Sequence, residues 1–266
     1  MAEDLCTYSV DQGVAVLTFN RPDAMNGMTG NMEVAYFTSL LQAEADPDVR
    51  VIVVTGAGRA FCPGADLAHR PGPGDEPLPN TSMERTTPLD ISKPMIAAIN
   101  GACAGVGLAY ALQCDLRFAK RGAKFTTAFA RRGLIGEYGM AWLLHSIAGR
   151  QVALDLLLSA RVVLAEEAAE LGLISAAVDG DDLMSHVLTY ARDVAANASP
   201  ASLATIKHQV NSEPAMSAHE ALHHAEALMR ESLTGADVTE GISSFLEKRQ
   251  VEFAPLGEGT RFDWMR

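Results

Sequence analysis

Hydrophobic positions near the start of the chain follow three successive patterns. Apolar or alternating runs over 7–10 and 14–19 flank turn-forming residues at 11–13, which predicts a β-hairpin. Apolar residues at helical spacing follow over 32–45, and an apolar run over 49–55 is typical of a buried strand. A strand, a helix and a strand in this order predict a βαβ unit with a parallel sheet.

The rest of the chain changes from mixed strands and helices to helices alone. Short apolar strands are predicted over 94–99, 115–119 and 124–127, with a helix of small and apolar residues over 108–113. Helical patterns then cover 138–148, 151–158, 165–171, 183–196, 200–210, 217–233 and 238–253. We therefore expect an α/β core over residues 1–199 and a helical C-terminal region over 200–266.

Proline and glycine interrupt this pattern between residues 70 and 92. Four prolines and two glycines fall within 70–79, a density that argues against a regular helix or strand. A loop of this length inside a compact domain is a lid or binding loop in some proteins and a mobile surface loop in others. The sequence leaves both interpretations open.

Composition and charge narrow the functional classes. Hydrophobic residues make up 48% of the 266 residues and charged residues 20%, a balance typical of a globular protein. The 33 acidic residues exceed the 21 basic residues, and the net charge of −12 opposes binding to nucleic acid or to an anionic membrane. No apolar run approaches the roughly 20 residues of a membrane-spanning helix. The acidic segment 1–11 is unlike a signal or transit peptide.

The cysteines indicate a reducing environment. Cys6, Cys62, Cys103 and Cys114 are widely spaced and form neither a CxxC pair nor a metal-ligand pattern. A disulfide framework normally needs a higher density of cysteine than this. We therefore expect reduced thiols in a cytoplasmic protein, and no metal site.

Four separated segments carry recognisable motifs. They are Asn20-Arg21-Pro22 with Met25-Asn26, the segment 58–67, the segment 93–107 with Cys114-Asp115, and the segment 240–249. In this order and spacing they resemble the crotonase (enoyl-CoA hydratase/isomerase) superfamily over about residues 7–250. The resemblance implies an α/β fold, a crotonase-like spiral of ββα repeats with a C-terminal helical subdomain. It also implies a homotrimer or a dimer of trimers, and an acyl-CoA thioester substrate in fatty-acid metabolism, with coenzyme A as part of the substrate and no separate cofactor.

The same resemblance implies an oxyanion hole. Removing a proton beside a thioester carbonyl places negative charge on the carbonyl oxygen, which two backbone N–H groups can stabilise by on the order of 3 kcal/mol each. The family match assigns these donors to Ala65 and Val106. Taken alone, the neighbouring Gly64 and Gly105 would be ordinary turn glycines.

Further contacts to the substrate follow from the resemblance alone. The implied coenzyme A and substrate contacts are Ala24, Gly64, Asp66, Leu67, Gly105, Phe245 and Lys248. Phe245 and Lys248 match residues that reach coenzyme A from a neighbouring subunit. An amphipathic terminal helix explains these two residues equally well.

One departure from the family pattern bears on the reaction. Hydratases of the family carry two carboxylates at positions that align with Ala109 and Phe129, and neither of these side chains can move a proton. Glu137 lies nearby in a glycine-rich turn, at the position of the single base of some enoyl-CoA isomerases of the family. A single base suffices to move a double bond. The competing interpretation is a carboxylate that stabilises a helix N-terminus by about 0.3–1 kcal/mol.

We therefore expect a Δ3,Δ2-enoyl-CoA isomerase with Glu137 as its only acid and base. Two alternatives stay open. The first is an enoyl-CoA hydratase or hydrolase that uses Glu137 with a loop acid or water. The second is a catalytically weak acyl-CoA binder that keeps the oxyanion loops.

Overall fold

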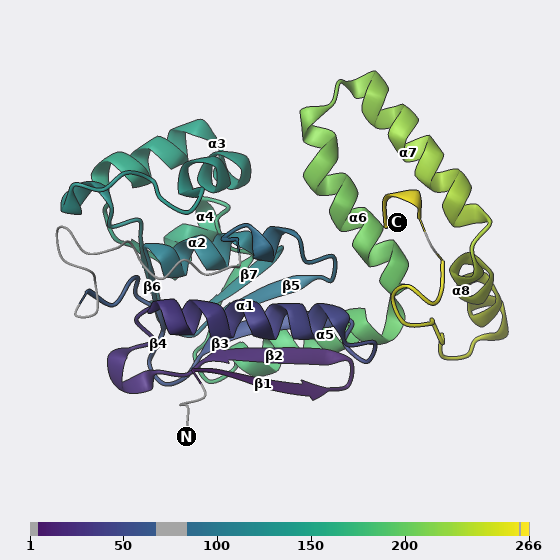
Figure 1. Cartoon of the computed structure of the whole chain (residues 1–266), viewed down its shortest axis with the longest axis horizontal. Coiled ribbons are helices and arrows are strands. Elements are labelled where there is room, and N and C mark those ends of the chain that lie inside the picture. The colour runs from purple at the N-terminus through teal and green to yellow at the C-terminus, as the bar shows by residue number, and fades with distance from the viewer. Residues whose placement is uncertain (1–4, 68–83, 261, 266) are drawn as a thin grey trace.

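A computed structural model describes residues 5–67, 84–260 and 262–265 (Figure 1). The proline- and glycine-rich stretch at 70–79 lies outside these residues. Of the expected loop, only the part from Glu84 onward is described, and it contains the short 3-10 helix η3 (Thr87–Leu89). No helix among the described residues combines the length and the apolar character that crossing a bilayer requires.

Two sheets organise the α/β part. The six strands of the larger sheet, in spatial order, are β1 (Cys6–Asp11), β2 (Val14–Phe19), β3 (Val51–Gly56), β5 (Met95–Ile99), β7 (Leu116–Lys120) and β10 (Ala176–Val178). The smaller sheet contains β4 (Ala60–Cys62), β6 (Ala102–Ala104), β8 (Lys124–Thr126) and β9 (Val163–Leu164). Neighbouring strands run parallel except in the β1–β2 hairpin and the β8–β9 pair, so the predicted hairpin and the parallel β2–β3 unit are confirmed.

From β3 to β8, successive strands alternate between the two sheets. β3, β5 and β7 belong to the larger sheet, and the strand that follows each of them, β4, β6 or β8, belongs to the smaller one. The connections are short: a side-chain carbon on Gly101, between β5 and β6, would overlap the carbonyl oxygen of Arg59. Repetition of this pair builds a spiral, which confirms the predicted crotonase-like fold.

Helices cover the sheets and extend beside them (Figure 1). Those of the α/β part are α1 (Gly30–Ala45), α2 (Val106–Gln113), α3 (Met140–Ser159), α4 (Ala165–Glu170) and α5 (Leu183–Asn197). The C-terminal helices are α6 (Pro200–Ser212), α7 (Ala218–Leu233) and α8 (Ala236–Glu247). The remaining short 3-10 helices are η1 (Pro22–Ala24), η4 (Ala130–Arg132), η5 (Glu213–Ala215) and η6 (Asp263–Met265).

Both faces of the larger sheet are buried, which explains the unbroken apolar run in β3. Val51 and Val53 pack with α5 on one face. Ile52 and Val54 belong to the main core, which also contains buried residues of α1 and α2. A parallel strand covered on both faces has no reason to alternate between apolar and polar residues.

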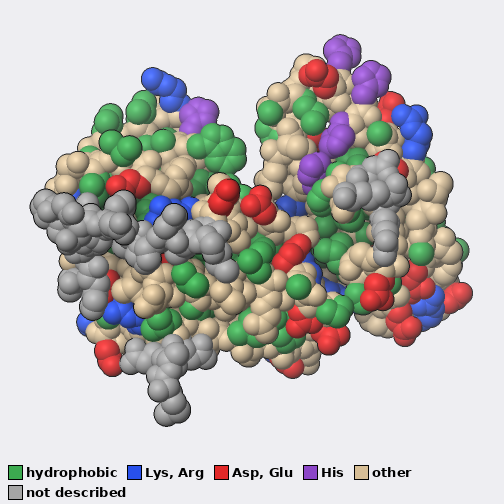
Figure 2. Space-filling view, viewed as in Figure 1, with side chains coloured by type: hydrophobic (Ala, Val, Ile, Leu, Met, Phe, Trp, Pro, Cys, Tyr) green, Lys and Arg blue, Asp and Glu red, His purple; other side chains and the backbone are tan. Residues whose placement is uncertain are grey.

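The C-terminal helices lie beside the sheets rather than over them. Figure 2 shows a notch between α6–α8 and the rest of the molecule on the face in view. A small separate cluster of Ala201, Leu228 and Phe262 packs within this part. The division at residue 199 remains a prediction.

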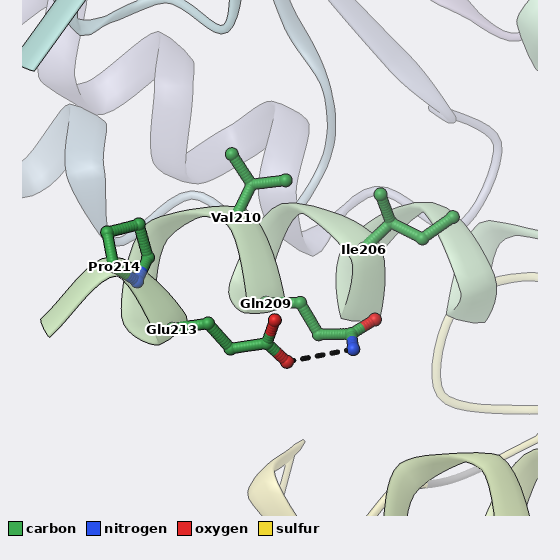
Figure 3. Close-up of a pocket in the computed structure, with 5 residues that line it drawn as sticks. All are labelled: Ile206, Gln209, Val210, Glu213 and Pro214. Carbon is green, nitrogen blue, oxygen red and sulfur yellow. Dashed lines mark hydrogen bonds between the residues drawn. The ribbon is translucent and has the colours of Figure 1, made fainter. Parts of the chain in front are cut away.

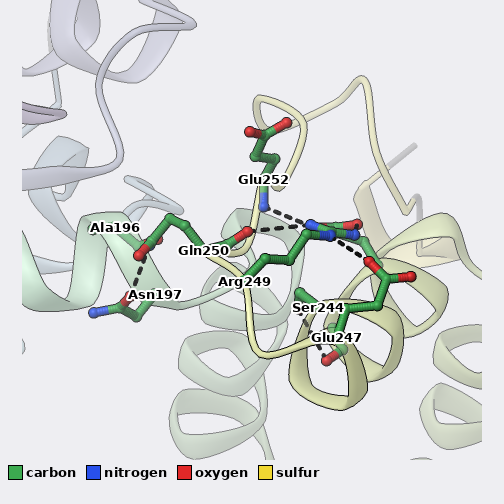
Figure 4. A network of polar contacts seen from close by, with 9 residues as sticks. Ala196, Asn197, Ser244, Glu247, Arg249, Gln250 and Glu252 are labelled. Carbon is green, nitrogen blue, oxygen red and sulfur yellow. Dashed lines mark hydrogen bonds and ion pairs between the residues drawn. The ribbon is translucent and has the colours of Figure 1, made fainter.

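The end of α8 differs from the sequence-based expectation. The predicted helix runs to residue 253, whereas α8 ends at Glu247 because Lys248 adopts left-handed backbone angles (φ +55°). Arg249 then turns back and forms ion pairs with Glu240 at 2.6 Å and Glu247 at 2.7 Å (Figure 4). Gln250 donates to Asn197 at the end of α5, so the chain after α8 is drawn back to the α/β part.

Candidate active site

The predicted oxyanion loops lie at one edge of the smaller sheet. β4, β6 and β8 are neighbouring parallel strands, so their carboxyl ends lie side by side. Gly64 follows β4, and Gly105 follows β6 directly. The crevice outside the carboxyl ends of parallel strands is a common place for ligands in α/β proteins.

The backbones of the two loops are in contact. Gly64 has φ +117° and Gly105 has φ +51°, angles that favour glycine. A side-chain carbon built on Gly105 would lie 3.6 Å from the Cα atom of Gly64. Two loops that are 41 positions apart in the sequence therefore lie within the reach of a side chain, and their backbone angles, not a lack of space, favour glycine.

Each loop is followed by a backbone N–H that is not used by the neighbouring secondary structure. The N–H of Met28 donates to Gly64 and the N–H of Asp66 donates to Met28, each at 2.9 Å, which leaves the N–H of Ala65 on the other side of this bridge. Val106 is the first residue of α2, where an N–H has no acceptor within the helix. The helix dipole also favours negative charge at this end.

The first motif segment folds against the first loop. Arg21 forms an ion pair with Asp66 at 3.0 Å and donates to the carbonyl oxygen of Gly27. Ala24 belongs to the same turn, and its carbonyl oxygen accepts from the N–H of Gly27 at 3.0 Å. The structure therefore brings Ala24 and Asp66 close to the predicted oxyanion loops. The ion pair with Arg21 holds the Asp66 carboxylate in place.

Two asparagines brace the turn that leads into β4. The amide nitrogen of buried Asn26 donates to the carbonyl oxygens of Ala57 at 2.9 Å and Ala60 at 2.7 Å. The amide nitrogen of Asn100 donates to Gly56 at 2.8 Å. Both asparagines belong to the motif segments, but this role could not be predicted from the sequence, because the acceptors are backbone groups far away along the chain.

Glu137 lies in the irregular turn between η4 and α3, which follows β8 in the chain. Its side chain is half-buried, its N–H donates to Ile135 at 2.9 Å, and its carbonyl oxygen accepts from Met140 at 3.0 Å. Tyr138 is left-handed at φ +55°, which costs about 1–2 kcal/mol in a residue with a side chain. Such strain persists only where the surroundings hold it.

Among the described residues, the two positions that align with the hydratase carboxylates offer no group that moves a proton. Ala109 and Phe129, which align with the two hydratase carboxylates, are both buried apolar side chains. Cys62 lies just before the first loop, but burial raises the pKa of its thiol to about 12. A thiol with that pKa is not a nucleophile near neutral pH.

An ionic cluster around the buried carboxylate of Glu33 lies beside the Glu137 turn, and it was not predicted from the sequence. Glu33 of α1 accepts a hydrogen bond from Tyr110 of α2 and one from Arg85 at 3.4 Å, and Arg85 lies over the ring of Tyr138. Helical spacing carried a signal for Glu33, because residue 33 shares a face with Tyr36, with residue 37 and with residue 40, all buried.

The remaining predicted residues are not all brought together. Leu67 is exposed next to the first loop, whereas Phe245 is on α8 and Lys248 follows its last residue, away from β4 and β6 (Figure 1). Phe245 is 82% exposed. Contacts of these two residues with coenzyme A bound to a neighbouring subunit stay a prediction.

A shallow pocket of about 440 Å³ lies elsewhere, on α6 and η5 (Figure 3). Its lining residues are Ile206, Gln209, Val210, Glu213 and Pro214. None of the predicted site residues lines it, and Glu213 is already bound to Gln209 at 2.9 Å.

Comparison with known proteins gives consistent matches. A family model described as enoyl-CoA hydratase/isomerase matches residues 9–255. A 1,2-epoxyphenylacetyl-CoA isomerase from Escherichia coli is 37% identical, over 92% of this chain and 96% of the relative. An (E)-benzylidenesuccinyl-CoA hydratase from Thauera aromatica is 34% identical, over 93% and 98%. A crystal structure of a probable enoyl-CoA hydratase/isomerase from Mycobacterium abscessus superposes with a TM-score of 0.87 at 28% identity, over 94% and 98%.

Proposed function

This chain is an enzyme of the enoyl-CoA hydratase/isomerase (crotonase) family, and from that premise we propose that it is a Δ3,Δ2-enoyl-CoA isomerase with Glu137 as its single acid and base. The observation that carries the proposal is which of the three aligned positions holds a side chain that can accept a proton. A carboxylate is present at Glu137, while Ala109 and Phe129 are apolar and buried.

The reaction needs one group that moves a proton and one place that holds charge. The Glu137 carboxylate removes a proton from C2 of a 3-enoyl-CoA, and the electrons move onto the thioester oxygen. The N–H groups of Ala65 and Val106 donate to that oxygen and stabilise the dienolate. The carboxylic acid then returns its proton to C4, which gives the 2-enoyl-CoA and restores the carboxylate.

Addition of water has weaker support in this chain. A two-carboxylate hydratase needs one group to activate water and another to deliver a proton, and the aligned positions hold Ala109 and Phe129. The relative from Escherichia coli is named as an isomerase of a CoA thioester, whereas the likeness to a hydratase from Thauera aromatica keeps hydration as the alternative.

The decisive experiment is a paired assay with 3-hexenoyl-CoA and crotonyl-CoA on the wild type and on Glu137→Gln. We expect conversion of the 3-enoyl thioester without hydration of crotonyl-CoA, and a loss of about 10²–10⁴-fold in kcat in the variant, because glutamine cannot accept the proton. Glu170→Gln, at an exposed glutamate of α4, is the matched control and should keep wild-type activity.

Each other outcome identifies a different function. Hydration of crotonyl-CoA that survives Glu137→Gln, with oxygen-18 incorporated from labelled water, contradicts the site assignment. Binding of both thioesters without turnover by the wild type identifies an acyl-CoA binder instead of an isomerase.

A further inference from the structure

A buried carboxylate on α1 begins a chain of contacts that ends beside Glu137. Glu33 is 2% exposed and accepts hydrogen bonds from the Tyr110 hydroxyl and from Arg85 Nε, the latter at 3.4 Å. A carboxylate removed from water is unfavourable unless it is paired and hydrogen-bonded. Glu33 therefore stabilises the positions of Tyr110 and Arg85, which come from two different segments of the chain.

Both partners of Glu33 contact the residue that follows Glu137. The guanidinium carbon of Arg85 lies 4.9 Å from the centre of the Tyr138 ring, within the range of a cation–π contact. The Tyr110 ring meets the Tyr138 ring edge-on, with 6.0 Å between the ring centres. Tyr138 thus lies between the Arg85 guanidinium and the Tyr110 ring, and Glu33 accepts a hydrogen bond from both of these residues.

Within the described part of the chain, the backbone hydrogen bonds of Glu137 do not reach the body of the protein. They are local: the N–H of Glu137 donates to Ile135 and its carbonyl oxygen accepts from Met140, and Ile135 is exposed. Leu134 and Tyr138 pack against the main core, and Tyr138 is the one adjacent to Glu137. Since Tyr138 is also left-handed, its ring contacts must hold a backbone conformation that the chain would otherwise leave.

The cluster provides fixed charges rather than a path for protons. Burial and the negative charge of Glu33 raise the pKa of Tyr138, and burial together with Glu33 raises the pKa of Tyr110. Desolvation lowers the pKa of Arg85, but its neighbours Tyr138 and Glu33 more than offset this, so its pKa is raised. Near neutral pH both tyrosines are therefore phenols and Arg85 is a cation.

We propose that Glu33, Tyr110 and Arg85 are positioning residues that hold Tyr138 and thereby aim the Glu137 carboxylate at the reacting carbon. The kinetic part of this inference rests on the proposed function. The structural part, that the cluster orders the turn at 133–139, does not.

Hydrogen exchange tests the structural part directly. In Arg85→Ala, amides of the segment 133–140 should exchange about tenfold faster than in the wild type, because the turn opens locally more often. Arg121→Ala is the matched control, since Arg121 lies between β7 and β8 and forms an exposed ion pair with Asp179 at 2.8 Å. Unchanged exchange of the segment 133–140 in Arg85→Ala overturns the proposal, whatever reaction the enzyme catalyses.

Kinetics with 3-hexenoyl-CoA test the aiming of Glu137. Arg85→Ala should lower kcat about 10- to 100-fold while KM stays within about twofold, because a small displacement of a catalytic group slows the reaction without weakening substrate binding. Arg85→Lys, which keeps a cation near Tyr138, should recover part of the loss. Tyr138→Phe should retain more kcat than Tyr138→Ala, because only the phenylalanine keeps a ring between Arg85 and Tyr110.

A double-variant comparison separates positioning from direct contact with substrate. In a Glu137→Asp background, where the carboxylate is already displaced, Arg85→Ala should have a smaller effect on kcat than in the wild type. A change confined to KM would instead assign Arg85 to substrate binding and overturn the positioning role. A wild type inactive on 3-hexenoyl-CoA would contradict the isomerase proposal, and the exchange result would still decide the role of the cluster.

Discussion

Val106 shows how a backbone atom can be the functional part of a residue. Its side chain is buried, and it begins α2 directly after Gly105, whose backbone angles are open only to glycine. The proposed donor is the N–H, so the identity of the side chain matters little for the chemistry.

Replacing Val106 by proline removes that N–H and little else, since proline is well tolerated at the first position of a helix. We expect Val106→Pro to lower kcat about 10²–10³-fold, because one oxyanion donor is lost. Val106→Ala keeps the donor and serves as the control. Steady-state assays with melting temperatures measured alongside check this, and a folded Val106→Pro enzyme with wild-type kcat would remove Val106 from the oxyanion hole.

Individual residues were predictable from sequence where their role follows from type and order. Gly64 and Gly105 could be placed in loops, because the motifs around them occur in a fixed order. Arg85 could not be linked to Glu33, because the two are 52 positions apart and the contact depends on the path of the chain between them. A carboxylate on an apolar helix face was the available signal for Glu33.

At the scale of elements, longer segments were predicted better than short ones. The hairpin, α1 and β3 were found because their periodicity extends over several residues. Strands β4, β6 and β10 have three residues each, too few for periodicity to show, and they were missed, although the equally short β8 was predicted. The two predicted helices at 138–148 and 151–158 meet at Gly149, whose non-helical angles separate them within α3.

The end of α8 depends on ion pairs that periodicity cannot reveal. The Arg249 guanidinium and the N–H of Glu252 lower the pKa of Glu240 to about 2. Because this folded-state pKa lies below the ordinary value of 4.5, Glu240 stabilises the fold above about pH 4.5. That contribution is lost as the pH falls from about 4.5 to about 2.

We therefore expect the urea midpoint of Glu240→Gln to lie below that of the wild type at pH 6, with the difference shrinking toward pH 2. Arg249→Ala should show the same convergence, because it removes the other partner of the pair. Urea unfolding at a series of pH values measures both. A difference between wild type and Glu240→Gln that stays constant down to pH 2 would contradict this assignment.

At the scale of the whole molecule, the exposed apolar side chains are candidates for contacts between subunits. Large contiguous apolar areas on a protein surface commonly mark interfaces. Half or more of the side chain is exposed in Ile135, Trp142, Leu158, Val210, Phe245 and Leu246, which come from the Glu137 turn, α3, α6 and α8.

We expect a homotrimer or a dimer of trimers in solution. Light scattering coupled to size exclusion should give about 85 kDa for a trimer, three times the chain mass of 28.3 kDa, or about twice that for a hexamer. Phe245→Ser, at a residue that is 82% exposed, tests whether α8 contributes to the interface. A wild-type monomer at micromolar concentration would contradict the predicted assembly.

The alternation of strands between two sheets has a consequence for how activities diversify. The first proposed donor follows β4, the second follows β6, and Glu137 follows β8, so each comes from a different turn of the spiral. The proposed charge stabilisation and the proposed proton transfer are therefore encoded by separate segments of the sequence. Mutation can exchange the side chain that moves the proton in one repeat while the two repeats proposed to bind the anion stay unchanged. The same architecture can therefore acquire new reactions and still bind a thioester.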